Sequence, residues 1–365
     1  MVNPVPEIIV TSEIKKVKNT NPLIRDVVCL IGCFESGDEY IPVFCKDLTE
    51  AETTFGDDTE YDGNRALKKI FHKDISGCLI VNVPSTTSGT APNITITQNI
   101  TKKKLEDSLN TVALIDIDQL YVATELTDEL ITVIDDFCND RFESKRPCGY
   151  IGAGSRTGAS AAAILSAYET TAGKLKDHCY AFITQTLTVD NDELDLIETG
   201  AYLTNLIANL PVGNSLTAST LPEVTGVGTT YTFEKGATPG LGRSLVGLGF
   251  FVVRLIDALN NTYEVVNSAN PNGLDLYIGR VRDYIVNDFA LRDFLGEKNN
   301  KITHDLVSME CNRIYTKFKE TLGVIEGMTY FIEKENSNTL NVVITELKFA
   351  DVITKINVYI TIEVE

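Results

Sequence analysis

The most regular alternation of hydrophobic and polar positions lies at the end of the chain, in residues 352–365. From Lys355 to Glu365 the odd positions are polar or amphipathic, and from 352 to 364 the even positions are apolar except for Thr354. The apolar positions are Val352, Ile356, Val358, Ile360, Ile362 and Val364. A period of two predicts a β-strand with one buried face. Another strand-like run begins at Leu340 and is separated from this one by Phe349-Ala350-Asp351.

A long strand at the end of a chain should present an unpaired edge, which natural proteins usually blunt. Here only Lys355, Glu363 and Glu365 interrupt the pattern with charge. Two interpretations fit this pattern. The strand pairs inside its own domain, or it is an arm that completes the sheet of a neighbouring subunit.

Residues 1–22 also have the pattern of an arm. A short apolar run, followed by Lys15, Lys16 and Lys18, precedes the turn-rich segment Asn19-Thr-Asn-Pro22. The apolar run contains Ile8, Ile9 and Val10. Chain ends are often disordered, but three consecutive β-branched residues favour a docked strand over a frayed terminus.

Strand-like and helix-like segments alternate between residues 26 and 210. The expected strands are Asp26–Cys33, Ile41–Phe44, Cys78–Val83, Ala113–Ile117, Leu120–Ala123, Cys148–Ile151 and His178–Thr184. The expected helices are Leu48–Gly56, Arg65–His72, one with Thr127 as its N-cap, 159–173 and 193–208. The polar residues 85–104 predict a surface hairpin or insertion. The alternation predicts an α/β sheet that is covered on both faces.

The sequence after residue 210 predicts a second domain. Residues 211–250 are rich in Gly, Thr and Ser and are expected to be irregular. Two helices, Tyr277–Phe294 and 302–322, precede the closing strands. The second is expected to place Val307, Cys311, Ile314 and Phe318 on one face. The fold class is therefore α/β (α+β overall), with an α/β sheet core, a C-terminal α+β domain and extended terminal β-arms. The expected divisions are an N-terminal arm and linker 1–22, an α/β domain 23–240, a C-terminal domain 241–350 and a strand arm 351–365.

Composition narrows the class of protein. The chain has 365 residues, 43% of them hydrophobic, which suffices for two or three domains with buried cores. Its formal net charge of −19 argues against a general nucleic-acid binder. No apolar run reaches the length of a membrane span, and the N-terminus has no export-signal pattern. The eight cysteines contain no CxxC and are expected to be reduced and mostly buried.

The search for catalytic or ligand motifs gives one candidate. Gly152, Gly154 and Gly158 lie between a predicted strand and a predicted helix, which is the setting of a dinucleotide loop. Their spacing is one residue too long, so a tight strand–helix turn is the alternative. Three scattered histidines, with His178-Cys179 as the nearest approach to a metal site, support neither a metal centre nor a catalytic triad. We therefore expect no enzyme activity, no cofactor and no metal.

Several stretches together resemble one family. They are Val27–Gly32, Ser36-Gly37, Ile41–Phe44, Leu48–Gly56, Ala66–Phe71, Gly77–Val83, Ser219–Val224, Leu245–Arg254, Tyr277–Ile285 and Phe294-Leu-Gly296 with Asn299. In this order they are similar to the contractile tail sheath proteins of phages, R-type bacteriocins and related contractile injection systems. The resemblance follows order and pattern over nearly the whole chain. This chain is short, so large outer insertions are missing.

The resemblance implies a structural subunit that polymerises with itself as stacked, hexameric rings around a tail tube. Its terminal strands would join the C-terminal sheets of neighbours, and contraction would drive the tube through a target envelope. Partners would be the tail tube protein and the baseplate and tail terminator proteins, with no nucleic acid and no direct membrane insertion. The location would be a virion tail or contractile particle assembled in the host cytoplasm. The last helix would face the tube, with Arg313, Lys317 and Lys319 as contacts; a solvated helix face is the alternative.

Two hypotheses from different classes therefore remain: a sheath subunit, or an α/β nucleotide-binding enzyme that uses the Gly152–Gly158 loop. The two hypotheses make different predictions about the C-terminal strand. Deleting residues 353–365 should leave a sheath subunit folded and unable to polymerise, whereas an enzyme would lose its fold or keep its oligomeric state. A tube or baseplate protein is a third possibility, which the long α/β half disfavours.

Overall fold

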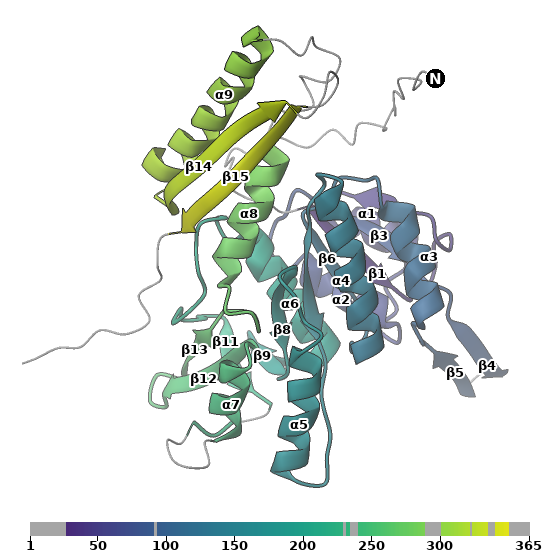
Figure 1. Cartoon of the computed structure of the whole chain (residues 1–365). Helices are drawn as coiled ribbons and strands as arrows, with labels where there is room; N and C mark the ends of the chain where they lie inside the picture. Colours follow the sequence, from purple (N-terminus) through teal and green to yellow (C-terminus); the bar gives the residue numbers. More distant parts are fainter. Residues whose placement is uncertain are drawn as a thin grey trace, which may run out of the picture. The chain divides into compact units, whose positions relative to one another are not determined.

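The computed structural model describes residues 27–90, 93–228, 231–233, 240–288, 301–321, 323–334 and 340–349. They form two compact units (Figure 1). The first unit contains the described residues up to Gly154 together with Asp195–Pro211, and the second contains Ser155–Leu194 together with the described residues from Val212 onward. The domain boundaries expected from the sequence stay a prediction.

The first unit is built on a mainly parallel sheet. Its strands are β1 (Val27–Gly32), β2 (Val43–Cys45), β3 (Gly77–Asn82), β6 (Gln119–Val122) and β7 (Gly149–Ala153), in the spatial order β2-β3-β1-β6-β7. β1 pairs in parallel with β3 and β6, β6 pairs in parallel with β7, and β2 joins β3 antiparallel. β1, β3, β6 and β7 are buried along their whole length, as expected for a sheet covered on both faces.

Five helices cover this sheet. They are α1 (Leu48–Phe55), α2 (Asp62–Ile70), α3 (Lys102–Val112), α4 (Asp128–Glu143) and α6 (Leu196–Asn209). Helix α2 packs on α6, and α3 packs on α4. Asp47, Thr101, Thr127 and Asp195 each cap a helix by accepting a hydrogen bond from the backbone N–H three residues later. The predicted cap at Thr127 is thereby confirmed. The strands β4 (Thr86–Thr90) and β5 (Asn93–Thr97) pair within residues 85–104.

One prediction for this unit was wrong, and one helix was missed. Helix α3 was not predicted, and residues 113–117 form the turn after it instead of a strand. The buried guanidinium of Arg141 on α4 donates hydrogen bonds to the carbonyls of Val112, Ala113 and Ile115 (3.0, 2.8 and 2.9 Å). Because these carbonyls are held by a side chain, the apolar run at 113–117 has no strand ladder to join.

The second unit combines short sheets with helices. Its strands are β8 (Cys179–Ile183), β9 (Leu187–Val189), β10 (Asp192–Glu193), β11 (Val224–Val227), β12 (Val252–Asp257), β13 (Thr262–Asn267), β14 (Ile325–Lys334) and β15 (Leu340–Phe349). The order β10-β9-β11 makes one sheet, and β12-β13 and β14-β15 make antiparallel pairs. Its helices are α5 (Ala161–Ala172), α7 (Leu241–Gly247), α8 (Leu276–Asp288), α9 (Lys301–Thr316) and the π-helical η2 (Lys317–Thr321).

A buried carboxylate fixes the start of α8. Asp275 accepts hydrogen bonds from the hydroxyls of Ser215, Thr217 and Ser268 (2.8, 2.8 and 3.0 Å). Its other oxygen accepts from the backbone N–H of Tyr277 at 3.2 Å. The irregular segment after Val212, the end of β13 and helix α8 are therefore joined through one side chain. Mixed α/β architecture, as the sequence predicts, is confirmed for the chain.

Candidate functional site

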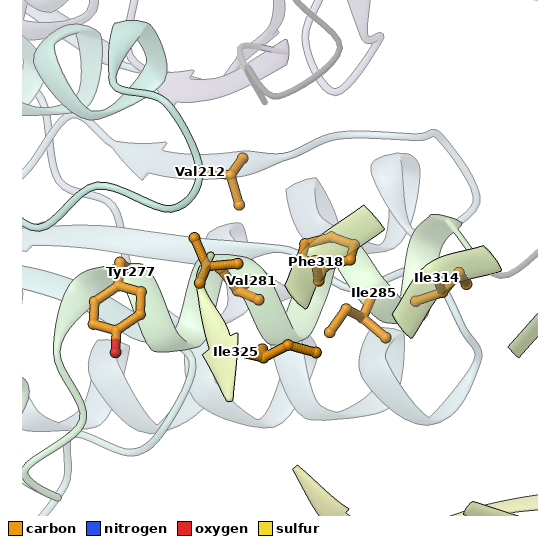
Figure 2. Packing of buried hydrophobic residues seen from close by; sticks show 8 residues of the cluster. Val212, Tyr277, Val281, Ile285, Ile314, Phe318 and Ile325 are labelled. Atoms are coloured by element: carbon orange, nitrogen blue, oxygen red, sulfur yellow. The ribbon is translucent and has the colours of Figure 1, made fainter. Parts of the chain in front are cut away.

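The predicted contact helix lies in the second unit, where α8, α9, η2 and the β14–β15 hairpin pack together. Figure 2 shows the apolar cluster that holds them. It contains Val212, Tyr277, Val281, Ile285, Ile314, Phe318, Val324 and Ile325. α9 and η2 place Val307, Cys311, Ile314 and Phe318 inward, as the sequence predicts. This cluster fixes the opposite face of α9 toward solvent.

The end of this helix has a recognisable signal. The expected helix 302–322 is α9 followed by the π-helical turn η2, and Gly323 follows with φ +63°. The N–H of Gly323 donates to the carbonyl of Lys319 (3.2 Å), and that of Val324 donates to Phe318 (3.0 Å). A left-handed glycine that closes the last carbonyls is a common helix end. It turns the chain directly into β14.

The three predicted contact cations are all on the described helix, and each has a partner within the chain. Arg313 donates to both carboxylate oxygens of Glu310 (2.8 and 2.7 Å). Lys317 donates to the hydroxyl of Tyr284 (3.1 Å) and lies 4.6 Å from the centroid of that ring. These contacts neutralise the positive charge of Arg313 and shield that of Lys317, two of the residues that the sequence predicts to contact a partner.

Lys319 is exposed and donates to the hydroxyl of Tyr315 at 2.6 Å. This hydrogen bond, together with the charge interaction with the same hydroxyl, raises the pKa of Lys319. Lys319 therefore stays a cation at neutral pH, and it is exposed, as is Arg313.

The structure adds a surface that the sequence pattern did not single out. Ile302, Leu306 and Met309 on α9 expose 71%, 46% and 67% of their surface. They follow one another at spacings of four and three residues, so they form one stripe on the helix. This spacing is visible in the sequence, but the buried face and the cations dominate the pattern of the helix.

The hairpin β14–β15 is a two-stranded antiparallel ribbon. It runs from the pair Lys334↔Leu340 to the pair Ile325↔Phe349, with two irregularities. The Tyr330 hydroxyl of β14 donates to Asn312 Oδ1 (3.0 Å) and to the Ser308 carbonyl (3.1 Å) of α9, which ties the ribbon to the helix. β14 is a strand that the sequence did not predict, whereas β15 was predicted from the run that begins at Leu340.

Each strand of this ribbon has one partner and one edge that pairs with no other strand among the described residues. Phe331, at 45% exposure, stands on the face opposite to Tyr330. Ten-residue strands with free edges expose backbone donors and acceptors to any further strand. The predicted arm residues lie outside the described part of the chain. They are Ile8, Ile9, Val10, Ile356, Val358, Ile360, Ile362 and Val364.

The glycine loop that was the alternative candidate is packed against the following helix. A Cβ on Gly158 would lie 2.9 Å from the backbone nitrogen of Ile164 and 3.0 Å from the Ala163 carbonyl carbon. Ser160 accepts the N–H of Ala163, and Arg156 Nε donates to Thr171 Oγ1 (2.8 Å). The loop packs so closely on the helix that a side chain at position 158 would collide with it. This favours the interpretation of the glycines as a tight turn.

The buried His178 lies beside a cation. Arg282 Nη2 is 3.1 Å from His178 Nδ1, and Arg282 Nε donates to Asp283 (2.9 Å). Burial, followed by the charge of Arg282, lowers the pKa of His178. Within the described ranges no group of three or more His, Cys, Asp or Glu side chains is arranged to hold a metal ion. No helix in the described ranges is long and apolar enough to cross a bilayer.

No family model matches the chain, and no curated protein matches its sequence. Solved structures do match. The sheath tail protein from Desulfitobacterium hafniense has a TM-score of 0.63 and 13% identity, over 91% of this chain and 98% of that one. The sheath tail protein from Listeria innocua has a TM-score of 0.62 and 10% identity, over 90% and 94%.

A chain of the helical sheath of the anti-feeding prophage, in its contracted state, is also similar. The TM-score is 0.61 at 12% identity, over 100% of this chain and 99% of that one. The likeness extends across both compact units, and it agrees with the fold expected from the order of the sequence patterns. The chain has the fold of the contractile tail sheath proteins.

Proposed function

We propose that this chain is the structural subunit of a contractile tail sheath, which polymerises around a tail tube and contracts. The observation that carries the proposal is the β14–β15 ribbon, whose two outer edges have no partner strand among the described residues of a chain with the sheath fold. Additional strands on these edges would join one subunit to the next through main-chain hydrogen bonds.

The C-terminal segment has a suitable length for such a strand. β14 and β15 have ten residues each, and the alternating segment 356–364 has nine. At a rise of about 3.3 Å per residue, the length of the segment 356–364 as a strand would differ from the lengths of β14 and β15 by one residue. We assign 356–364 and the run Ile8–Val10 to the ribbon edges of neighbouring subunits. Because such pairing depends on the backbone, the lattice would stay connected while the subunits rotate, provided that the linkers bend.

We assign the tube-facing surface to the solvent side of α9. The apolar stripe of Ile302, Leu306 and Met309 provides its hydrophobic part, and Arg313 and Lys319 provide exposed cations beside it. Lys317 is half-buried over Tyr284 and serves more to hold η2 on α8. An exposed apolar stripe bordered by charge is typical of a protein-binding surface.

Contraction in this proposal needs no chemistry from the subunit. Its energy is stored when the extended lattice assembles and is released as the lattice passes to a more stable form. The partners are further copies of the chain in hexameric rings, the tube protein, and baseplate and terminator proteins. A chain of the anti-feeding prophage baseplate has a TM-score of 0.67 to this one at 12% identity, which supports a baseplate contact. The particle would be a virion tail or related device assembled in the host cytoplasm.

Electron microscopy of the purified chain over a range of concentrations tests the proposal. We expect hollow helical tubes from the full chain and folded, discrete subunits after deletion of residues 353–365. Circular dichroism of the deletion variant must show an unchanged fold, because the assigned arm lies outside the two compact units' described residues.

A matched pair of point variants sharpens this test. Ile360→Pro removes a backbone donor from the assigned arm strand and should abolish the tubes. Glu363→Gln changes only a side chain on the polar face and should leave the tubes intact. Tubes that persist after both the deletion and Ile360→Pro would refute strand exchange by the C-terminal arm.

A further inference from the structure

A groove lies between α3 and α4 in the first unit and has no role in the function proposed above. Its volume is about 500 Å³. Its floor includes Leu109 of α3 and Val133 and Phe137 of α4, of which Leu109 is buried and the other two are half-buried. A groove with an apolar floor between two helices is a suitable binding site for an extended segment of chain.

The two rims of this groove differ in charge. On the α3 side, Lys103 pairs with Asp107 (2.6 Å), and Lys102 lies 3.9 Å from Glu106. These cations are therefore matched by acids of the same helix. The α4 side contributes only carboxylates as charged groups. They are Glu129, Asp136 and Asp140, and all three residues are exposed.

The start of the described chain is tied to the segment that follows α3. The N–H of Val27 donates to the Asp118 carboxylate (3.2 Å), and the N–H of Asp118 donates to the Val27 carbonyl (2.8 Å). Arg141 of α4 binds the carbonyls of residues 112, 113 and 115 in the turn that leads to Asp118. The described chain therefore begins near the C-terminal ends of α3 and α4.

The segment before Val27 contains a cluster of lysines, whereas the α4 rim of the groove contains carboxylates. Lys15, Lys16 and Lys18 lie nine to twelve residues before Val27, with Val17 among them. Nine residues of extended chain span at most about 30 Å, and the 16-residue helix α4 is about 24 Å long. The lysines can therefore reach the whole acidic rim from their own first unit.

We propose that the segment Lys15–Lys18 docks in the α3–α4 groove of its own chain. Val17 covers the apolar floor beside Phe137, and the lysine side chains reach the carboxylates of the α4 rim. Long lysine stems can cover apolar surface while the ammonium groups stay at a charged edge. The docked segment anchors the N-terminal arm and sets the direction in which residues 1–14 leave the subunit. The docking is independent of what the arm itself binds.

Site-directed crosslinking tests this docking in the full-length chain. All eight native cysteines are buried, so introduced surface cysteines react selectively with a short bifunctional maleimide. Val17→Cys combined with Asn110→Cys, which lines the groove, should give an intramolecular crosslink in the folded protein. The control combines Val17→Cys with Asn139→Cys, which is exposed on α4 and does not line the groove. We expect at least a fivefold higher yield for the groove pair.

Charge reversal tests the recognition itself. Replacing Lys15, Lys16 and Lys18 with Glu should lower the crosslink yield severalfold, and so should 0.5 M salt, because surface ion pairs are screened. Adding Asp136→Lys and Asp140→Lys to the lysine variant should restore the yield. Equal yields for the groove and control pairs would overturn the docking. A crosslink found only between two chains, seen as a dimer on a denaturing gel, would overturn docking within one chain.

Discussion

The Tyr330 hydroxyl on β14 donates a hydrogen bond to the backbone carbonyl of Ser308 on α9, over 3.1 Å. The same hydroxyl also lies 3.0 Å from Ser308 Oγ and from Asn312 Oδ1. One phenol group thus connects the solvent-exposed helix to the ribbon with open edges. The two surfaces that the proposed function uses are joined at this residue.

Tyr330→Phe should lower the free energy of unfolding by about 1 kcal/mol, because it removes one partly buried hydrogen-bond network without creating a cavity. Chemical denaturation of the second unit measures this loss. Thr329→Ser, at the neighbouring exposed position on β14, is the matched control and should change the stability by less than about 0.5 kcal/mol. Equal stability of Tyr330→Phe and the wild type would show that the hydroxyl does not hold the ribbon to α9.

Lys317→Gln should destabilise the second unit by about 0.5–1 kcal/mol, because the ammonium group lies over the Tyr284 ring and donates to its hydroxyl. Lys319→Gln changes an exposed side chain and should leave the thermal midpoint unchanged. Comparing the melting curves of the two variants measures the difference. A larger loss for Lys319→Gln would contradict the division of roles between the two lysines.

Replacing Ile302, Leu306 and Met309 together with Ser should weaken tube binding and leave the fold intact, since all three side chains are largely exposed. Co-sedimentation with tubes assembled from the same particle's tube protein measures binding. We expect at least a tenfold loss of affinity. Thr316→Ser on the exposed side of α9 is the control. Wild-type binding by the triple variant would remove the stripe from the proposed tube-facing surface.

The stability of the second unit should fall between pH 7.5 and pH 5.5 through His178. Burial and the nearby Arg282 lower the pKa of His178 in the folded state. The unfolded chain therefore takes up a proton near pH 6.5 that the folded chain does not yet accept. The stabilisation is complete above pH 6.5 and is lost as the pH falls toward the folded pKa, by about 1.4 kcal/mol for each unit of difference.

His178→Gln keeps a hydrogen-bond acceptor for Arg282 and removes the titration. Urea unfolding gives the free energy of unfolding of the variant and of the wild type at pH 7.5 and pH 5.5. Because the other titrating groups are the same in both proteins, the difference between the two pH dependences reports His178. Asp177, Asp283 and Lys176 also act on His178 and are unchanged in both proteins. An identical pH dependence in the two proteins would rule out His178 as its source.

Gly158→Ala should destabilise the second unit by about 1–3 kcal/mol, because the added Cβ would lie about 3 Å from the backbone of Ala163 and Ile164. Thermal unfolding with and without ATP or NAD measures this loss and also tests the loop for nucleotide binding. Gly273→Ser, at a position with open space but with φ +78°, serves as a control for backbone strain alone. A nucleotide-dependent rise of the wild-type midpoint by several degrees would favour the alternative function.

The sequence by itself determined the elements whose pattern is local. The buried strands at 27–32 and 77–82, the cap at Thr127 and the inward face of α9 all follow from apolar runs, hydroxyl side chains and spacing within one segment. The order of these elements along the chain also indicates the fold of the sheath proteins. These features depend on contacts that neighbouring residues make with one another or with a generic apolar core.

Only the tertiary structure decided features that depend on distant partners. Residues 113–117 have a strand-like pattern, but Arg141, which lies 26 to 29 residues after its acceptors, binds the carbonyls around them. The sequence pattern shows no partner for the cations of η2, yet Lys317 and Lys319 donate to Tyr284 and Tyr315. A sequence pattern records which side chains a segment has, whereas pairing depends on which groups folding brings within hydrogen-bond distance.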